Sequence, residues 1–199
     1  LRPGEPVWVG GSTWAGEEEA LLDAYRAAKA RHPGLLLVLV PRHAERRDEV
    51  LAAIRARGLS VVQRSRFPDG APPPAARPDV LLVDTTGELR GFYAAADLVF
   101  VGKSLTQTGG QNPIEPARDG RAILVGPHME NFAEIARDFQ AAGAWIQVQD
   151  APELTAAALH LLGDSPERER LGCVAAALVA RQAGATPQMA ARVLAARLR

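Results

Sequence analysis

Seven short apolar runs alternate along the chain with longer segments in which apolar residues recur every three or four positions. The runs lie at 7–10, 35–40, 60–64, 80–84, 98–102, 122–126 and 144–148. Most of them are apolar at nearly every position, as in strands that are covered on both faces of a sheet. We therefore expect seven buried strands.

The segments between these runs have the periodicity of amphipathic helices. In 17–32, Leu21, Leu22, Tyr25 and Ala28 share one face, and three glutamates open the segment, where the helix dipole favours acidic side chains. The same pattern predicts further helices at 46–58, 88–96, 112–120, 132–143, 152–163, 166–182 and 187–198.

Strands that alternate with helices predict an α/β fold, a Rossmann-like doubly wound parallel sheet. We expect a single domain over residues 1–199, with a helical C-terminal tail at about 150–199 and a proline-rich loop at 66–79. Right-handed crossovers place the carboxyl ends of the strands along one edge of the sheet. Ligands of such sheets bind at that edge.

Composition excludes several classes of function. The 23 basic and 23 acidic residues give a formal net charge of zero, which argues against a nucleic-acid partner. A single cysteine cannot form an internal disulfide or a cysteine metal cluster, and the four histidines lack metal-ligand spacing. We expect His160 to be a packing residue. No Gly-x-Ser-x-Gly elbow is present, and no apolar run approaches the ~18 residues of a membrane span.

Polar and glycine-rich turns follow the predicted strands at the ligand edge. Gly11 and Ser12 could present backbone N–H groups to an anion, or simply form a strand–turn–helix junction. Arg42 could pair with a phosphate and His43 could stack or hydrogen-bond, or both could belong to a solvated basic turn. Gly87 allows close approach of a ligand, and Thr85 or Thr86 could cap the next helix.

The stretch TGGQNPIEP at 108–116 combines several of these features. Asn112 is a good N-cap and Pro113 a good first helical residue. Glu115 could close a capping box with Asn112, or accept hydrogen bonds from the vicinal hydroxyls of a ribose. Lys103 adds a positive charge at the mouth of this loop.

Taken together, these motifs resemble a known family. GGSTWAGEEEALLDAY, LVLVPRHAER, VLLVDTTGELRGFYAAADLVFVGKSL, GGQNPIEPA and ILVGPHMENFAEIA follow one another in the order found in the C-terminal half of the 3-deoxy-D-manno-octulosonic acid (Kdo) transferases. These are GT-B glycosyltransferases of lipopolysaccharide synthesis. The resemblance covers about residues 7–145 most closely.

The resemblance implies that this half binds the CMP moiety of the donor, CMP-Kdo. The implied nucleotide-binding residues are Pro41, Arg42, His43, Thr86, Gly87, Glu88, Asn112, Pro113, Ile114 and Glu115. Further contacts to phosphate or sugar would come from Gly11, Ser12, Lys103, Gly110 and Gln111. The resemblance implies no cofactor and no metal, and it places no catalytic residue in this chain.

In such enzymes the acceptor site and the catalytic base lie in the N-terminal half. The abrupt start, LRPGEPVWVG, predicts a fragment that lacks this half. The full-length protein would transfer Kdo to a lipid A precursor at the cytoplasmic face of the bacterial inner membrane. The N-terminal half would contact the lipid acceptor, and the present piece would be soluble and inactive alone.

Four positions depart from the family pattern. Trp14 replaces a usual His, Thr85-Thr86 a usual Thr-Met, Lys103 a usual Gly, and Gln111 a usual His. These departures leave two alternatives open. One is a GT-B transferase or epimerase that uses a UDP-sugar, and the other is a non-catalytic domain that binds nucleotide sugars.

Overall fold

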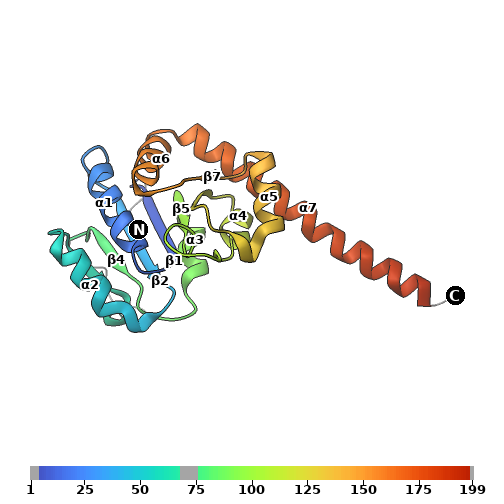
Figure 1. Cartoon of the computed structure of the whole chain (residues 1–199), viewed down its shortest axis with the longest axis horizontal. Helices are drawn as coiled ribbons and strands as arrows, with labels where there is room; N and C mark the ends of the chain where they lie inside the picture. Colours follow the sequence, from blue (N-terminus) through green and yellow to red (C-terminus); the bar gives the residue numbers. More distant parts are fainter. Residues whose placement is uncertain (1–4, 68–75, 198–199) are drawn as a thin grey trace.

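The computed structural model describes residues 5–67 and 76–197, with side chains up to Arg181. The predicted proline-rich loop at 66–79 therefore lies mostly outside the described residues. Within the described part, the chain alternates strands and helices from its first strand to its last helix (Figure 1).

Seven parallel strands form one sheet. They are β1 (Val7–Thr13), β2 (Leu36–Pro41), β3 (Val61–Gln63), β4 (Val80–Leu82), β5 (Leu98–Val101), β6 (Ala122–Val125) and β7 (Ile146–Gln147), in the spatial order β3-β4-β2-β1-β5-β6-β7. This confirms the predicted doubly wound parallel sheet. The chain places β2, β4 and β3, in that spatial order, on one side of β1, and β5, β6 and β7 on the other side. The carboxyl ends of β1 and β5 therefore mark the point where the strand order reverses, which is where such sheets bind ligands.

Alternate residues of each central strand enter opposite cores. In β5, Leu98 and Phe100 pack in the core formed with α1 (Glu17–Lys29), α2 (Arg47–Ala56) and α6 (Ala151–Gly163). Val99 and Val101 pack in the other core, with α3 (Leu89–Ala94), α4 (Ile114–Arg118), α5 (Ala133–Ala142) and α7 (Ser165–Arg197). The strands between β3 and β7 in the sheet are largely apolar because both of their faces are covered by helices. The edge strands β3 and β7 are only half-buried and each contains a glutamine, so the expectation of seven buried strands is wrong for these two.

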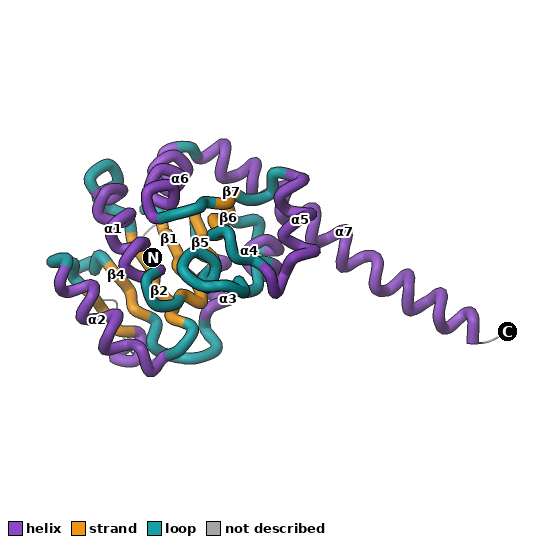
Figure 2. The backbone as a smooth tube through the Cα atoms, viewed as in Figure 1, coloured by secondary structure: helices purple, strands orange, loops and turns teal. Residues whose placement is uncertain are grey.

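Short 3-10 turns complete the connections after β2, β3 and β6. They are η1 (Ala44–Arg46), η2 (Arg64–Arg66) and η3 (Glu130–Phe132). Each stands close to the carboxyl end of a strand, and η1 and η3 lead directly into helices α2 and α5 (Figure 2). The loop after β5 is long and runs from 102 to 113 before α4 begins.

The last helix differs from the prediction. Two helices were expected at 166–182 and 187–198, because Gly184 and Pro187 favour a break between them. The structure has one helix, α7, through both positions, and its end projects away from the sheet (Figure 1). A proline removes one N–H from the helical ladder, and the many alanine, leucine and arginine residues around it favour continuation.

Candidate functional site

The loops after β1, β2 and β5 meet at the carboxyl edge of the sheet. The Arg42 amide donates to the Thr13 carbonyl at 3.0 Å, and the Gly102 amide donates to the Gly11 carbonyl at 2.8 Å. Gly11, Ser12 and Pro41 are part of strands β1 and β2, and the Arg42 side chain is exposed beyond them. The structure thus brings the predicted groups of these three strand ends together.

The Trp14 ring stands between two of the predicted site residues. The His43 ring meets it edge-on, with 5.0 Å between ring centroids, and the Lys103 ammonium lies 4.4 Å from its centroid. Trp14 follows β1, His43 follows β2 and Lys103 follows β5. One indole therefore contacts a histidine and a lysine that follow the two strands flanking β1.

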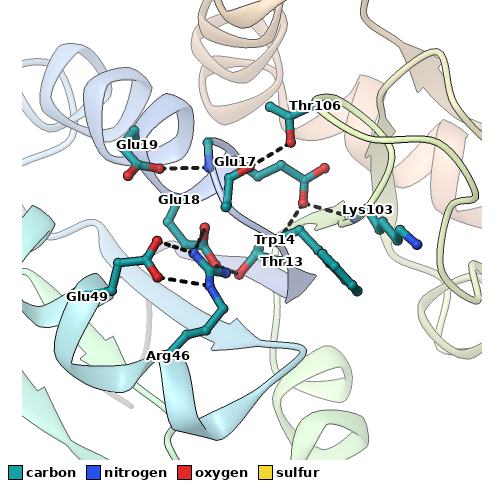
Figure 3. Close-up of polar contacts among 11 residues, drawn as sticks. Thr13, Trp14, Glu17, Glu18, Glu19, Arg46, Glu49, Lys103 and Thr106 are labelled. Carbon is teal, nitrogen blue, oxygen red and sulfur yellow. Dashed lines mark hydrogen bonds and ion pairs between the residues drawn. The ribbon is translucent and has the colours of Figure 1, made fainter.

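A buried carboxylate fixes the loop that carries Lys103. Glu17, with 0% of its surface exposed, accepts hydrogen bonds from the amides of Lys103 at 2.9 Å, Ser104 at 2.8 Å and Leu105 at 2.9 Å. Its Oε2 also accepts from the Trp14 amide at 2.9 Å (Figure 3). Burial raises the pKa of Glu17, and these four donors oppose that rise. The amides that could have bound an anion here are already occupied by a side chain.

The neighbouring carboxylate, Glu18, joins the loops after β1 and β2. It is 1% exposed, accepts from the Thr13 hydroxyl at 2.8 Å and pairs with the Arg46 guanidinium at 2.8 Å. Arg46 also pairs with Glu49 at 2.7 Å (Figure 3). Burial raises the pKa of Glu18, and the bonds from Arg46 and Thr13 oppose it. Glu18 and Arg46 thereby hold the turn that contains Arg42 and His43 against β1.

The segment after β4 is arranged differently. The Glu88 carboxylate pairs with Arg64, from the turn after β3, at 2.8 Å and accepts a hydrogen bond from the Thr85 hydroxyl. The predicted capping of the next helix by Thr85 or Thr86 is wrong, since no side chain caps α3 and Thr85 is engaged with Glu88 instead. Thr86 and Gly87 are exposed, and β4 is separated from β1 by β2. Among the described residues, no hydrogen bond or ion pair joins this segment to Trp14, His43 or Lys103.

The 108–116 loop is braced against the turn after β6. The Gly109 amide donates to the Glu130 carboxylate at 2.6 Å, and the Gly109 carbonyl accepts from the Asn131 amide at 2.8 Å. Gly110 has a left-handed backbone and packs on Met129, so a side chain there would collide with that residue. These contacts set the path of the chain into Gln111 and α4.

The start of α4 differs from the predicted capping. The helix begins at Ile114 with the buried Pro113 at the N-cap position, so Asn112 lies one residue before the cap, where its side chain accepts from the Ile114 amide at 3.0 Å. Glu115 does not close the box, because its carboxylate forms no hydrogen bond with any described residue. Its charge instead acts on Tyr93, whose pKa is raised mainly by burial and further by Glu115.

Tyr93 of α3 connects Glu115 to β1. The side chain is 1% exposed and lies directly over Gly11, where a Cβ atom would come within 2.6 Å of the ring carbon Cζ. A glycine is therefore required at position 11 by packing of the tyrosine, besides any contact with a ligand.

Two remaining expectations concern histidines and membrane spans. His160 is exposed on α6, so its predicted packing role is wrong: the neighbouring Leu161 and Leu162 occupy the buried face. The described residues contain no group of three or more metal-ligating side chains that could hold a metal ion. They also contain no helix with the length and hydropathy needed to cross a bilayer.

Comparisons with known proteins identify the family. The chain is 41% identical to the 3-deoxy-D-manno-octulosonic acid transferase of Bordetella pertussis over 92% of its length, and 37% identical to that of Haemophilus influenzae over 84%. The crystal structure of the C-terminal CMP-Kdo binding domain of WaaA from Acinetobacter baumannii superposes with a TM-score of 0.79 at 33% identity, covering 87% of this chain and 88% of that one. The chain belongs to the Kdo transferase family. It spans 43% and 38% of the length of the two transferases.

More distant structures share the fold with this Kdo transferase domain. Anabaena HepE in complex with UDP superposes with a TM-score of 0.66 over 96% of this chain and 48% of its own, at 16% identity. At that identity the likeness shows the GT-B C-terminal fold alone. No protein-family model matches the chain.

Two of the four positions that were expected to depart from the family pattern are in contact with each other. Trp14 stands where the family usually has His and Lys103 where it usually has Gly, and the ammonium of Lys103 lies on the Trp14 ring. Gln111, the third departure at the strand ends, is half-buried beside Asn112.

The sequence analysis missed residues that hold the loops of this candidate site together. Glu17, Glu18, Arg46 and Tyr93 were not among the predicted site residues, although each joins two of its loops. A signal was present: Glu17 and Glu18 precede Leu21 and Leu22 by four positions, which places two acids on the buried face of α1.

Proposed function

We propose that this chain is the donor-binding domain of a Kdo transferase and that it binds the CMP moiety of CMP-Kdo at the carboxyl ends of β1, β2 and β5. The observation that carries the proposal is the contact of His43 with Trp14, in the same turn as the exposed Arg42, at the reversal of strand order in a chain of this family. In the whole protein, a second half would bind the lipid A precursor and supply the catalytic base.

The residues of this site suit a nucleoside monophosphate ester. The exposed Arg42 guanidinium can pair with the phosphate, since its turn is fixed by the Arg42 amide bond to Thr13. The Glu115 carboxylate has no hydrogen-bond partner among the described residues, so it is free to accept bonds from two ribose hydroxyls. The Glu88 carboxylate is engaged with Arg64 and Thr85, so we propose that the 86–88 turn contacts the nucleotide through its backbone.

The chemistry follows from where charge builds up during transfer. When the bond between the sugar and the phosphate breaks, the CMP leaving group gains negative charge. Arg42 and His43 would stabilise that charge from fixed positions, which lowers the barrier because the groups need not reorganise. Closure of the second half over the donor would exclude water and favour transfer over hydrolysis.

Calorimetric titration of CMP into the chain tests the proposal. We expect CMP to bind, and the Arg42→Ala variant to bind it about tenfold to a hundredfold more weakly, the loss of about 1.5–3 kcal/mol typical of a charged hydrogen bond. Arg47→Ala is the matched control, because Arg47 is equally exposed five residues further along the same segment. Equal CMP affinity in Arg42→Ala and wild type would remove Arg42 from the site.

A comparison of CMP with UDP distinguishes this proposal from the alternative that the chain belongs to an enzyme using a UDP-sugar. CMP should raise the melting temperature of the chain more than UDP does at the same concentration. The reverse order would favour the UDP-sugar reading, which the shared fold with HepE permits. Transfer activity requires the whole protein, and its absence there with every sugar nucleotide would support a non-catalytic domain.

A further inference from the structure

Lys103 occupies a backbone conformation that lysine avoids. Its φ angle is 50°, in the left-handed region, and among the described non-glycine residues only Ser12, at 54°, shares this feature. The conformation is held from both sides: the Lys103 amide donates to Glu17 at 2.9 Å and the Lys103 carbonyl accepts from the Gly110 amide at 2.8 Å. A residue kept in such a conformation by its surroundings is a functional candidate, because glycine would fit there without strain.

The side chain of Lys103 is also held in place. Its ammonium lies on the face of Trp14 at 4.4 Å from the ring centroid and beside Gly109, where a Cβ atom would be 3.7 Å from the ammonium nitrogen. No carboxylate among the described residues forms an ion pair with it; the nearby Glu130 carboxylate is taken by the Gly109 amide and His128. The site therefore holds a fixed cation whose charge is not neutralised by the described part of the chain.

Trp14 also has an energetically unfavourable feature. Its indole N–H is buried and has no acceptor among the described residues. A phenylalanine would avoid this unpaired donor, so packing alone does not favour tryptophan here. Two locally unfavourable features, a left-handed lysine and an indole with an unpaired N–H, are in direct contact at the strand ends.

We propose that Trp14 and Lys103 form a specificity element in which Lys103 pairs with the carboxylate of the donor sugar. This inference rests on the proposed function. An octulosonic acid joined to CMP bears its carboxylate and the phosphate on the same anomeric carbon, so the donor presents two adjacent anions. Arg42 and His43, after β2, suit the phosphate, and Lys103, after β5 and on the Trp14 ring, suits the carboxylate. A UDP-hexose has no sugar carboxylate for Lys103 to pair with.

The test compares two ligands that differ only in this charge. Kdo and Kdo methyl ester are each titrated into the chain saturated with CMP, and binding is followed by nuclear magnetic resonance. Wild type should bind Kdo at least about fivefold more tightly than the ester, and Lys103→Gln should abolish that preference while changing CMP affinity by less than about twofold. Arg118→Gln, an exposed arginine at the end of α4, should keep the preference.

Lys103→Gly distinguishes this role from a structural one. Because glycine suits a φ of 50°, the variant should melt within a few degrees of wild type, yet it should lose the preference for Kdo over its ester. Trp14→Leu should weaken the preference by removing the ring that holds the ammonium, whereas Trp14→Phe should retain most of it.

The outcomes separate the two proposals. If wild type binds CMP but shows no preference for Kdo over the ester, or no Kdo binding, the role of Lys103 is refuted and the proposed function stands. A loss of CMP affinity in Lys103→Gln as large as that in Arg42→Ala would also overturn it, because Lys103 would then serve the phosphate. If wild type does not bind CMP, both proposals fail.

Discussion

Three consecutive glutamates at the start of α1 have three different partners. Glu17 accepts four backbone amides of the loops after β1 and β5, Glu18 pairs with Arg46 and Thr13, and Glu19 accepts from the Gly16 amide at 3.1 Å. Only Glu19 acts at the helix terminus itself, as the dipole argument predicts for all three. The other two point back into the molecule and define the shape of the site.

The isosteric change Glu17→Gln tests how much the hydrogen bonds accepted by this carboxylate stabilise the fold. In Glu17→Gln the side-chain amide would turn N–H groups toward two backbone N–H donors, so we expect a loss of about 3 kcal/mol in the free energy of unfolding. Urea denaturation at pH 7 measures it. Glu19→Gln, which touches a single exposed amide, should cost under about 1 kcal/mol, and equal losses in both variants would show that the four-amide contact adds nothing.

A substitution at Gly11 tests whether the packing of Tyr93 against β1 requires glycine at this position. In Gly11→Ala the new methyl group would collide with the Tyr93 ring, so we expect a loss of about 2–4 kcal/mol in the free energy of unfolding. Gly91→Ala is the control: it lies in the same helix as Tyr93, has open space around it, and should gain about 0.5–1 kcal/mol from helix propensity. A tolerated Gly11→Ala would mean that Tyr93 can move away.

At the scale of elements, the amino edge of the sheet depends on one acidic side chain. Asp79, before β4, pairs with Lys29 of α1 and accepts from the Ser60 amide at 2.8 Å and the Ser60 hydroxyl at 2.6 Å. It thereby ties α1 and the start of β3 to β4. Burial of Asp79 would raise its pKa, but the bonds from Lys29 and Ser60 outweigh burial and lower the pKa to about 2.

This shift predicts how stability changes with pH. Because the folded pKa is below the unfolded value near 3.8, the unfolded chain takes up the proton first on acidification. The contribution of Asp79, about 2 kcal/mol, should be complete above about pH 5 and lost as the pH falls to about 2. Asp79→Asn should therefore destabilise the chain at pH 7 and have little effect at pH 2, by urea denaturation.

A second variant, Asp23→Asn, serves as the control for this measurement. Asp23 pairs with Arg57 at the surface, with 59% of its side chain exposed, so Asp23→Asn should change stability little at any pH. If Asp79→Asn were as mild as Asp23→Asn at pH 7, the ion pair with Lys29 would not stabilise the sheet edge.

The elements themselves could be predicted because their signal is local. The strands between the two edge strands, β3 and β7, are apolar runs, and such runs indicate burial on both faces. The roles of Glu17 and Glu88 could not be predicted in this way. Besides one local partner each, Glu17 has partners 86–88 residues away and Glu88 has a partner 24 residues away, and these distant pairings depend on the folded arrangement of the loops. The same is true of Trp14, whose contacts with His43 and Lys103 exist only once β2 and β5 flank β1.

At the scale of the whole molecule, the amino and carboxyl ends of the parallel strands form two edges of the sheet that have different roles. The amino edge holds Asp79 and its partners, and the carboxyl edge holds Trp14, Arg42, Lys103 and Glu115. The loops at the carboxyl edge are braced by Glu17, Glu18 and Glu130 before any ligand binds, so binding need not order them. A ligand at this edge should therefore leave the far edge unchanged.

Hydrogen exchange can measure this directly. The amides of 106–108 and 111–112 have no backbone partner among the described residues, so they exchange through small local motions. Saturating CMP should slow their exchange and that of 42–44 by covering them. Amides in the loops at 31–34 and 57–60, which precede β2 and β3 at the amino edge, exchange by local motion too and should be unaffected. Slowing confined to the amino-edge loops would place the nucleotide at the wrong end of the sheet, whereas slowing confined to 106–112 would exclude Arg42 and His43 from its site.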